Sequence, residues 1–323
     1  MTRCAPLFVP LLFLSVIASL HAEDGPWTVE QDADGVTVQY EGEVFTRYEG
    51  LYQTKPILFP IVGPGGAEMT RGYPMRDALA TEKADHPHHR SFWWTHGDVD
   101  GVSFWHEGEG AGLTEHREFL SVSGGKSAVI TTRNDWLSLE KGEYSKKHLE
   151  DVRTVTCRVE GENRIVDFSI TLTAGKIPVK FGDTKEGSFG VRVPGTMKVD
   201  SKLGGKIVSS EGLEDGAAWG KEAAWVDYHG PVGNKTLGIA ILNHPSSFRY
   251  PTAWHVRTYG LFAANPFGYH DFKIDKEGAY ELAPGKSISF HYRVIFHPGD
   301  EKAAGIAEAF EKYAAQRIAV KNE

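Results

Sequence analysis

The chain has 323 residues, a formal net charge of −8 at pH 7, and 35 basic residues mixed with 43 acidic ones. No basic stripe and no polybasic or amphipathic membrane-surface segment stands out, so nucleic acid is not an expected partner. The two cysteines are Cys4 and Cys157; a disulfide-dependent miniature scaffold is therefore excluded, and a chain of this length buries a large core without one.

The first 22 residues have the order of a signal peptide. Arg3 gives a positive start, "PLFVPLLFLSVIASL" is apolar, and "LHA" precedes Glu23. The apolar run, about 15 residues, is short for a membrane span, and no cysteine follows it to mark a lipoprotein. We expect cleavage near Glu23 and a periplasmic or secreted mature chain with no integral membrane segment. An uncleaved N-terminal anchor is the alternative.

Period-two alternation of apolar and polar residues dominates the rest of the chain and predicts strands. The clearest cases are "RTVTCRVE" at 153–160, "IVDFSITLT" at 165–173 and "SISFHYRVIF" at 287–296. Each has one apolar face for a core and one polar face for solvent. Cys157 lies on the apolar face of the first of these. Frequent turn sequences such as "DADG", "EGEN" and "APGKS" favour short antiparallel connections.

One helix is expected, from Glu301 to Arg317, with Asp300 as its N-cap and Ile306, Phe310 and Tyr313 as its apolar stripe. No linker or repeat divides the strand pattern. The sequence therefore predicts an all-β fold: a large antiparallel β-sandwich that forms a single domain over 23–323, with a C-terminal helix at 301–317.

The segment "HPHHRSFWWTHGD", 86–98, is the strongest candidate for chemistry because it contains four histidines. In an extended chain His86, His88 and Arg90 project to one side, and Pro87 places them at an edge or in a loop. Imidazole serves both proton transfer and metal binding. "DTKEGSFGVRVPG", 183–195, adds a carboxylate and an arginine at Glu186 and Arg192.

The long segment at 241–268, "ILNHPSSFRYPTAWHVRTYGLFAANPFG", adds polar groups that follow a buried strand. Tryptophans near these residues suit the apolar faces of sugars, whose hydroxyls bind Arg, Asp, Asn and His. The candidate catalytic residues are His86, His88, His96 and Glu186. The candidate substrate-binding residues are Arg90, Trp94, Asp98, Arg192, Asn243, His244 and His255.

Four stretches carry a resemblance: "PILFPIVGPGGAEMTRGYPM", "DHPHHRSFWWTHGDVDGVSFW", "EGSFGVRVPGTM" and "NPFG". With these the chain resembles an exported bacterial family of unknown function that carries the label "methane oxygenase PmoA". The resemblance implies an exported β-rich protein, not a membrane methane monooxygenase, and it brings no established catalytic residues. The architecture is also similar to the galactose mutarotase-like supersandwich, in which a histidine and a glutamate act on a sugar.

The leading hypothesis is an exported carbohydrate-active enzyme, an epimerase, hydrolase or lyase, that works by histidine and carboxylate acid–base catalysis. Its partner would be a carbohydrate or another polar small molecule. The first alternative is a metalloenzyme with a divalent metal on His86, His88 and His96. The second is a non-catalytic glycan-binding or envelope protein.

Overall fold

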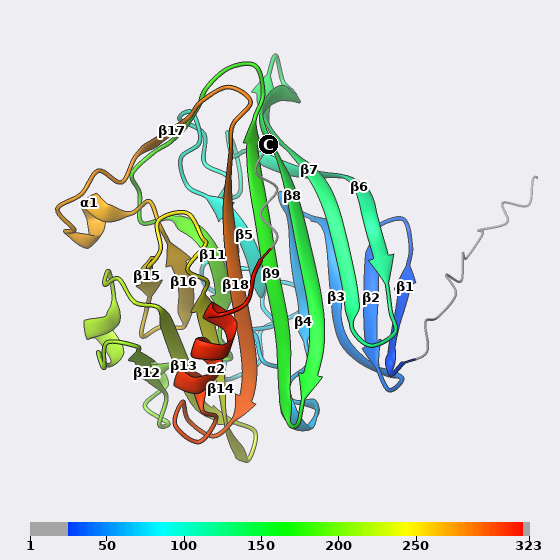
Figure 1. The fold of residues 1–323 in the computed structure, drawn as a ribbon, viewed down its shortest axis with the longest axis vertical. Helices are drawn as coiled ribbons and strands as arrows, with labels where there is room; N and C mark the ends of the chain where they lie inside the picture. Colours follow the sequence, from blue (N-terminus) through cyan, green and yellow to red (C-terminus); the bar gives the residue numbers. More distant parts are fainter. Residues whose placement is uncertain (1–24, 319–323) are drawn as a thin grey trace, which may run out of the picture.

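The structure is a computed structural model that describes residues 25–318. The expected signal peptide, 1–22, lies outside the described residues. Two eight-stranded antiparallel sheets face each other, and the main core lies between them (Figure 1). The expected all-β antiparallel sandwich is therefore confirmed. Within 25–318, none of the helices has the length and apolarity needed to cross a bilayer.

In spatial order the first sheet consists of β1 (Trp27–Gln31), β2 (Gly35–Tyr40), β3 (Glu43–Tyr52), β4 (Lys55–Ile61), β5 (Phe92–His96), β11 (Gly187–Arg192), β16 (Leu261–Asn265) and β15 (Ala253–Val256). The second sheet consists of β12 (Lys206–Ser209), β13 (Trp225–Val232), β14 (Lys235–Asn243), β18 (Ser287–Pro298), β9 (Asn163–Ala174), β8 (Glu143–Glu160), β7 (Ala128–Glu140) and β6 (Leu113–Ser123). The remaining elements are the strand pair β10 (Val179–Phe181) and β17 (Tyr280–Leu282), the short helices α1 (Tyr269–Phe272) and α2 (Ile306–Ala314), and 3-10 turns at Pro64–Gly66, Val199–Ser201 and Asp215–Ala218.

The alternation in the sequence decides which side of each strand meets the core. On β9 the predicted apolar set is buried in the main core, and on β18 the same holds for residues 288, 290, 292, 294 and 296. Cys157 on β8 is buried beside Val155, so it packs as a small apolar side chain, and burial raises the pKa of its thiol. These predictions are confirmed.

The C-terminal helix is shorter than the sequence predicts. α2 begins only at Ile306, because Gly305 has a left-handed φ of 62° and residues 301–305 form turns. Asp300 caps the preceding turn instead, where its Oδ1 accepts the amide of Ala303 at 2.8 Å. The expected apolar stripe packs on the side of the second sheet that faces away from the main core (Figure 1).

Candidate functional site

The outer face of the first sheet is the side turned away from the main core. It carries Lys55, Ile57, Trp93, Arg192, His255, Leu261 and Ala263, because their strand neighbours are the residues that point into the core. Trp93 lies at its centre and packs against Trp105 at 5.0 Å between ring centroids. Its ring crosses Gly190 on the neighbouring strand, where a Cβ would lie 2.5 Å from the indole. The glycine therefore leaves the space that the indole fills.

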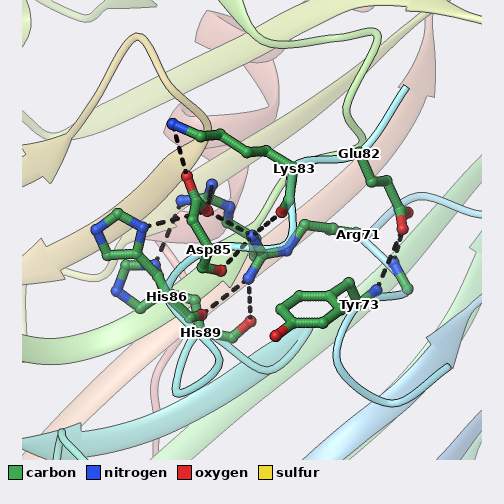
Figure 2. A network of polar contacts seen from close by, with 9 residues as sticks. Arg71, Tyr73, Glu82, Lys83, Asp85, His86 and His89 are labelled. Carbon is green, nitrogen blue, oxygen red and sulfur yellow. Dashed lines mark hydrogen bonds and ion pairs between the residues drawn. The ribbon is translucent and has the colours of Figure 1, made fainter. Parts of the chain in front are cut away.

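The histidine-rich loop lies over this face and is shaped by the buried guanidinium of Arg71 (Figure 2). Arg71 donates to the carbonyl oxygens of Lys83 at 3.1 Å, Asp85 at 2.9 Å, His86 at 2.9 Å and His89 at 3.3 Å. It also pairs with the carboxylate of Asp85 at 2.9 Å. One side chain thus fixes the backbone from residue 83 to residue 89.

The fixed loop holds its imidazoles in a stack. His86 stacks on Tyr259 at 5.2 Å and on His89 at 4.9 Å, and His89 stacks in turn on Trp93 at 5.6 Å. His88 meets His89 edge-on at 4.4 Å. The stack runs from the buried Trp93 to His86, whose side chain is 42% exposed. The predicted pair of His86 and His88 is therefore brought together at the surface of the face.

Cations surround these rings. Arg192 donates to Nδ1 of His89 at 3.3 Å and to Asp85 at 3.1 Å. Desolvation, aided by the charge of Lys55, lowers the pKa of His88 to about 3. Desolvation and then the charge of Arg192 hold the pKa of His89 well below its usual value. Both imidazoles are therefore uncharged near neutral pH.

A second polar network lies under the loop. Arg90 binds Glu107 with two hydrogen bonds, at 2.7 and 2.6 Å. The ammonium of the fully buried Lys55 lies 3.1 Å from Glu107 and donates to the carbonyl oxygen of Trp105 at 3.0 Å. Burial lowers the pKa of Lys55 to about 8, and the Glu107 carboxylate limits the fall. Arg90 is thus committed to an ion pair rather than free for a ligand.

His255 and Glu186 form the other part of the candidate site. Nδ1 of His255 donates to the carbonyl oxygen of Lys185 at 2.6 Å, so the lone pair of the neutral ring is on Nε2. Burial lowers the pKa of His255 to about 4, while the negative charge of Glu186 acts in the opposite direction. Tyr259 connects the two parts, since the guanidiniums of Arg192 and Arg257 lie over its ring at 4.9 and 5.4 Å.

Other predicted site residues lie away from this face. His96 points to the core side of β5, packs on Phe267 at 4.8 Å, and donates through Nε2 to the Gly182 carbonyl at 2.9 Å. Trp94 shares that orientation and is buried in the main core. Asp98 accepts the amide of Gly101 at 2.9 Å and closes a turn.

Asn243 and His244 lie at the end of β14 in the second sheet. Asn243 accepts the amide of Thr252 at 3.1 Å. His244 donates to the carbonyl oxygen of Gln316 at 3.1 Å and packs on Tyr313 of α2. Both side chains hold structure rather than face the candidate site.

The proposed metal trio of His86, His88 and His96 is not brought together. Within the described residues, one group of three or more His, Cys, Asp or Glu side chains has ligand atoms close enough together to hold a metal ion. It consists of Asp227, His229 and Glu301. Sequence reasoning also missed several polar residues that build the candidate site, namely Lys55, Arg71, Asp85, His89, Glu107 and Tyr259. His89 is the instructive case, since an extended chain would point it away from His86, whereas the turn created at His86, with its φ of 44°, stacks the two rings.

Comparison with known proteins gives the family. Residues 35–311 match the sequence model of a family described as "Family of unknown function (DUF6807)". The chain belongs to the DUF6807 family. The match spans both parts of the candidate site, and it agrees with the expectation of a family of unknown function. A search of curated proteins finds no significant match to this DUF6807 chain.

Solved structures give weak likenesses. A polysaccharide lyase is similar over 87% of this chain and 34% of its own, at 13% identity and a TM-score of 0.34. A beta-arabinopyranosidase is similar over 86% of this chain and 40% of its own, at 13% identity and a TM-score of 0.31. A galactose mutarotase-like protein from Lactobacillus casei is similar over 84% of this chain and 100% of its own, at 11% identity and a TM-score of 0.32. The DUF6807 chain thus spans well under half of the first two proteins, and likenesses at these scores say nothing of activity.

Proposed function

We propose that this protein is an exported carbohydrate-active enzyme whose substrate binds on the outer face of the first sheet. The observation that carries the proposal is the uncharged imidazole of His255, with its Nε2 lone pair free of the proton and the Glu186 carboxylate close enough to act on its pKa. At neutral pH the ring is in the unprotonated form that a general base needs, and the charge of Glu186 offsets part of the basicity that burial removes.

The roles follow from the contacts. Nε2 of His255 takes a proton from a sugar hydroxyl or an acidic C–H, and the charge of Glu186 stabilises the imidazolium that forms. Arg257 lies over both Trp219 and Tyr259, at 5.4 Å from each ring. This arrangement offers an aromatic surface and a cation to a polar ligand, whereas Arg90 and Arg192 already bind carboxylates of the protein.

The surroundings favour a polar or acidic sugar. Arg257 brings positive charge to the face, whereas Arg192 pairs with Asp85 and Lys185 with Glu186. Half-buried aromatic rings beside charged groups suit a ligand that, like a pyranose, has both apolar faces and hydroxyls. Export, which depends on 1–22, is part of the same proposal, and N-terminal sequencing of the protein recovered from outside the cytoplasm tests it. A cytoplasmic protein with an intact Met1 contradicts that part.

The central test is a carbohydrate screen. The purified protein is assayed by thermal shift against neutral and acidic mono- and oligosaccharides, and each hit is followed by NMR for epimerised, hydrolysed or unsaturated products. We expect His255→Gln to lower kcat by about 10²- to 10⁴-fold, the usual contribution of a positioned acid or base, with only a small change in ligand affinity. Glu186→Gln should lower kcat less, because it acts through His255.

His116→Gln is the matched control, since His116 is a half-buried histidine on β6 of the other sheet. It should keep the activity of the parent protein. Binding without turnover would favour the non-catalytic glycan-binding alternative. A parent that responds to no carbohydrate, or a His255→Gln variant as active as the parent, contradicts the proposed enzyme.

A further inference from the structure

A second cluster of titratable side chains lies on the opposite side of the molecule, where β18 leads into α2. It consists of Asp227 and His229 on β13, His297 on β18, and Glu301 in the following turn. Val226, Tyr228 and Phe296 point into the main core. The strand residues of the cluster therefore lie on the outer face of the second sheet.

The atoms of this cluster converge closely. Oδ1 of Asp227 lies 2.7 Å from Nδ1 of His229, and Oε2 of Glu301 lies 3.6 Å from the same nitrogen. The three ligand atoms all lie within 4.8 Å of one another. Two carboxylates thus approach one nitrogen, which has a single N–H and donates it to Asp227. The proton on this nitrogen can serve one carboxylate at a time. A cation placed among the three atoms would bind both carboxylates at once.

The second oxygen of Asp227 is held from behind. Oδ2 accepts from Nε2 of His297 at 2.6 Å, and Nδ1 of His297 lies 3.2 Å from the carbonyl oxygen of Pro298. The imidazole reaches Asp227 across Gly238, where a Cβ would lie 2.2 Å from its ring. Carboxylates that bind metals are commonly oriented in this way by a hydrogen bond to their other oxygen. Asp227 and His297 are fully buried, so the orientation is rigid.

We propose that Asp227, His229 and Glu301 bind one divalent transition-metal ion of the Zn²⁺ type. One imidazole and two carboxylates are ligands that zinc accepts, and three protein ligands leave a fourth position for water. Binding displaces the proton from Nδ1 of His229, after which its proton is on Nε2. This site is independent of the proposed sugar site, which lies on the other sheet.

The position of Glu301 gives the ion a structural effect. Glu301 lies in the turns between β18 and α2, so an ion held with Asp227 would fasten this connection to β13. The contacts of α2 with the second sheet are otherwise mainly apolar. Metal should therefore raise the melting temperature, because it binds the folded chain and not the unfolded one.

The test uses the full mature chain, purified without a metal column and dialysed against chelator. Isothermal titration with ZnCl₂, and with MnCl₂ and CaCl₂ for comparison, gives affinity and stoichiometry, and Co²⁺ absorption reports the coordination geometry. We expect one tight Zn²⁺ per chain. Glu301→Gln and His229→Gln should each weaken binding by about 10- to 100-fold or more, at least the loss seen when groups that only support a ligand are removed.

The double variant His86→Gln/His88→Gln is the control, because exposed histidines collect Zn²⁺ without a built site. It should keep the tight site and its thermal shift. Circular dichroism verifies the fold of each variant, and Glu301→Gln, which changes a partly exposed side chain, decides the matter if His229→Gln does not fold. Absence of tight binding, or tight binding that survives Glu301→Gln and is lost in the double variant, overturns the proposal.

Discussion

The outer faces of the two sheets both carry buried histidines, but they prepare them for opposite chemistry. On the first sheet, burial and nearby cations lower the pKa of His88 to about 3, and burial lowers that of His255 to about 4. On the second sheet, burial acts on His229 as well, yet Asp227 and Glu301 outweigh it and raise its pKa. For His255 burial outweighs the charge of Glu186, whereas for His229 two nearby carboxylates outweigh burial, so the balance of the two effects sets the direction of each pKa shift.

The two faces also differ in how they are held together. His86, His88 and His89 of the first face come from a loop, and one buried arginine shapes that loop through carbonyl oxygens, whereas His255 stands on β15. Asp227, His229 and His297 of the second face stand on strands, where backbone register sets their geometry, and Glu301 lies in the turn after β18. Removing a single side chain should therefore damage the first face far more than the second.

The largest effect is expected for Arg71→Met. It removes the hydrogen bonds to four carbonyl oxygens of the loop and one of the cations paired with the Asp85 carboxylate. We therefore expect a loss of about 3–5 kcal/mol in the free energy of unfolding. Urea denaturation measures it. Arg117→Met is the control, because Arg117 is half-exposed and pairs with Glu115 at the surface; it should cost less than about 1 kcal/mol. Equal losses in the two variants would show that the loop is held by other contacts.

A smaller loss of stability is expected at two glycines whose missing side chain leaves room for the ring of a neighbouring residue. Gly190→Ala would place a Cβ against Trp93 on the first face, and Gly238→Ala would place one against His297 on the second. Each substitution should lower the free energy of unfolding by about 1–3 kcal/mol, the usual cost of an overpacked site, as measured by urea denaturation. Gly175→Ala, which meets nothing within 4 Å, is the matched control. If Gly238→Ala behaves like the control, His297 does not need its position over that strand.

Much of this fold follows from the sequence, because alternation over strands such as 165–173 and 287–296 reports burial directly. The start of α2 does not follow from the sequence, because it depends on the turns at 301–305 and on the left-handed conformation of Gly305. His86, His88, Glu186, Arg192 and His255 follow from the sequence as candidate residues, and they lie at the outer face of the first sheet. The sequence does not show which side of β5 faces the core, because all five residues of this short strand are buried and either orientation fits them.

That ambiguity explains the misplaced residues. Trp94 and His96 share one side of β5, and the sequence analysis gave that side to the site, whereas Trp93 is the residue that lies on the outer face. Lys55 and Glu107 were missed because each is an ordinary charged residue until the fold places it beside Arg90. Pairings between positions about 50 residues apart leave no periodic signal in the chain.

A further effect is expected in the dependence of stability on pH. Because the folded pKa of His88 and His255 lies below the unfolded value near 6.5, their unfolded forms bind more protons in acid. Stability should therefore fall as pH drops from about 6.5 toward about 4, as measured by urea denaturation across this range. His229 has the opposite sign, since its stabilising effect is present below its unfolded pKa and is lost as pH rises through the folded one.

Variants separate the two contributions. His88→Gln should reduce the acid loss, and His229→Gln should reduce the loss on the alkaline side. His116 also has a lowered pKa, so His116→Gln shows how much of the acid loss one histidine outside the two sites contributes. An acid profile that His88→Gln leaves unchanged would contradict the idea that the first face keeps its imidazoles uncharged at a cost in stability.

The guanidinium of Arg71 has a consequence for how the family can diversify. It recognises carbonyl oxygens at residues 83, 85, 86 and 89, and every amino acid supplies that group. The path of the loop is therefore largely uncoupled from the identity of its side chains. Mutations at residues 86 and 88 can change what the first sheet presents to a ligand without redesigning the scaffold beneath, which makes the loop a natural place for new specificities to evolve.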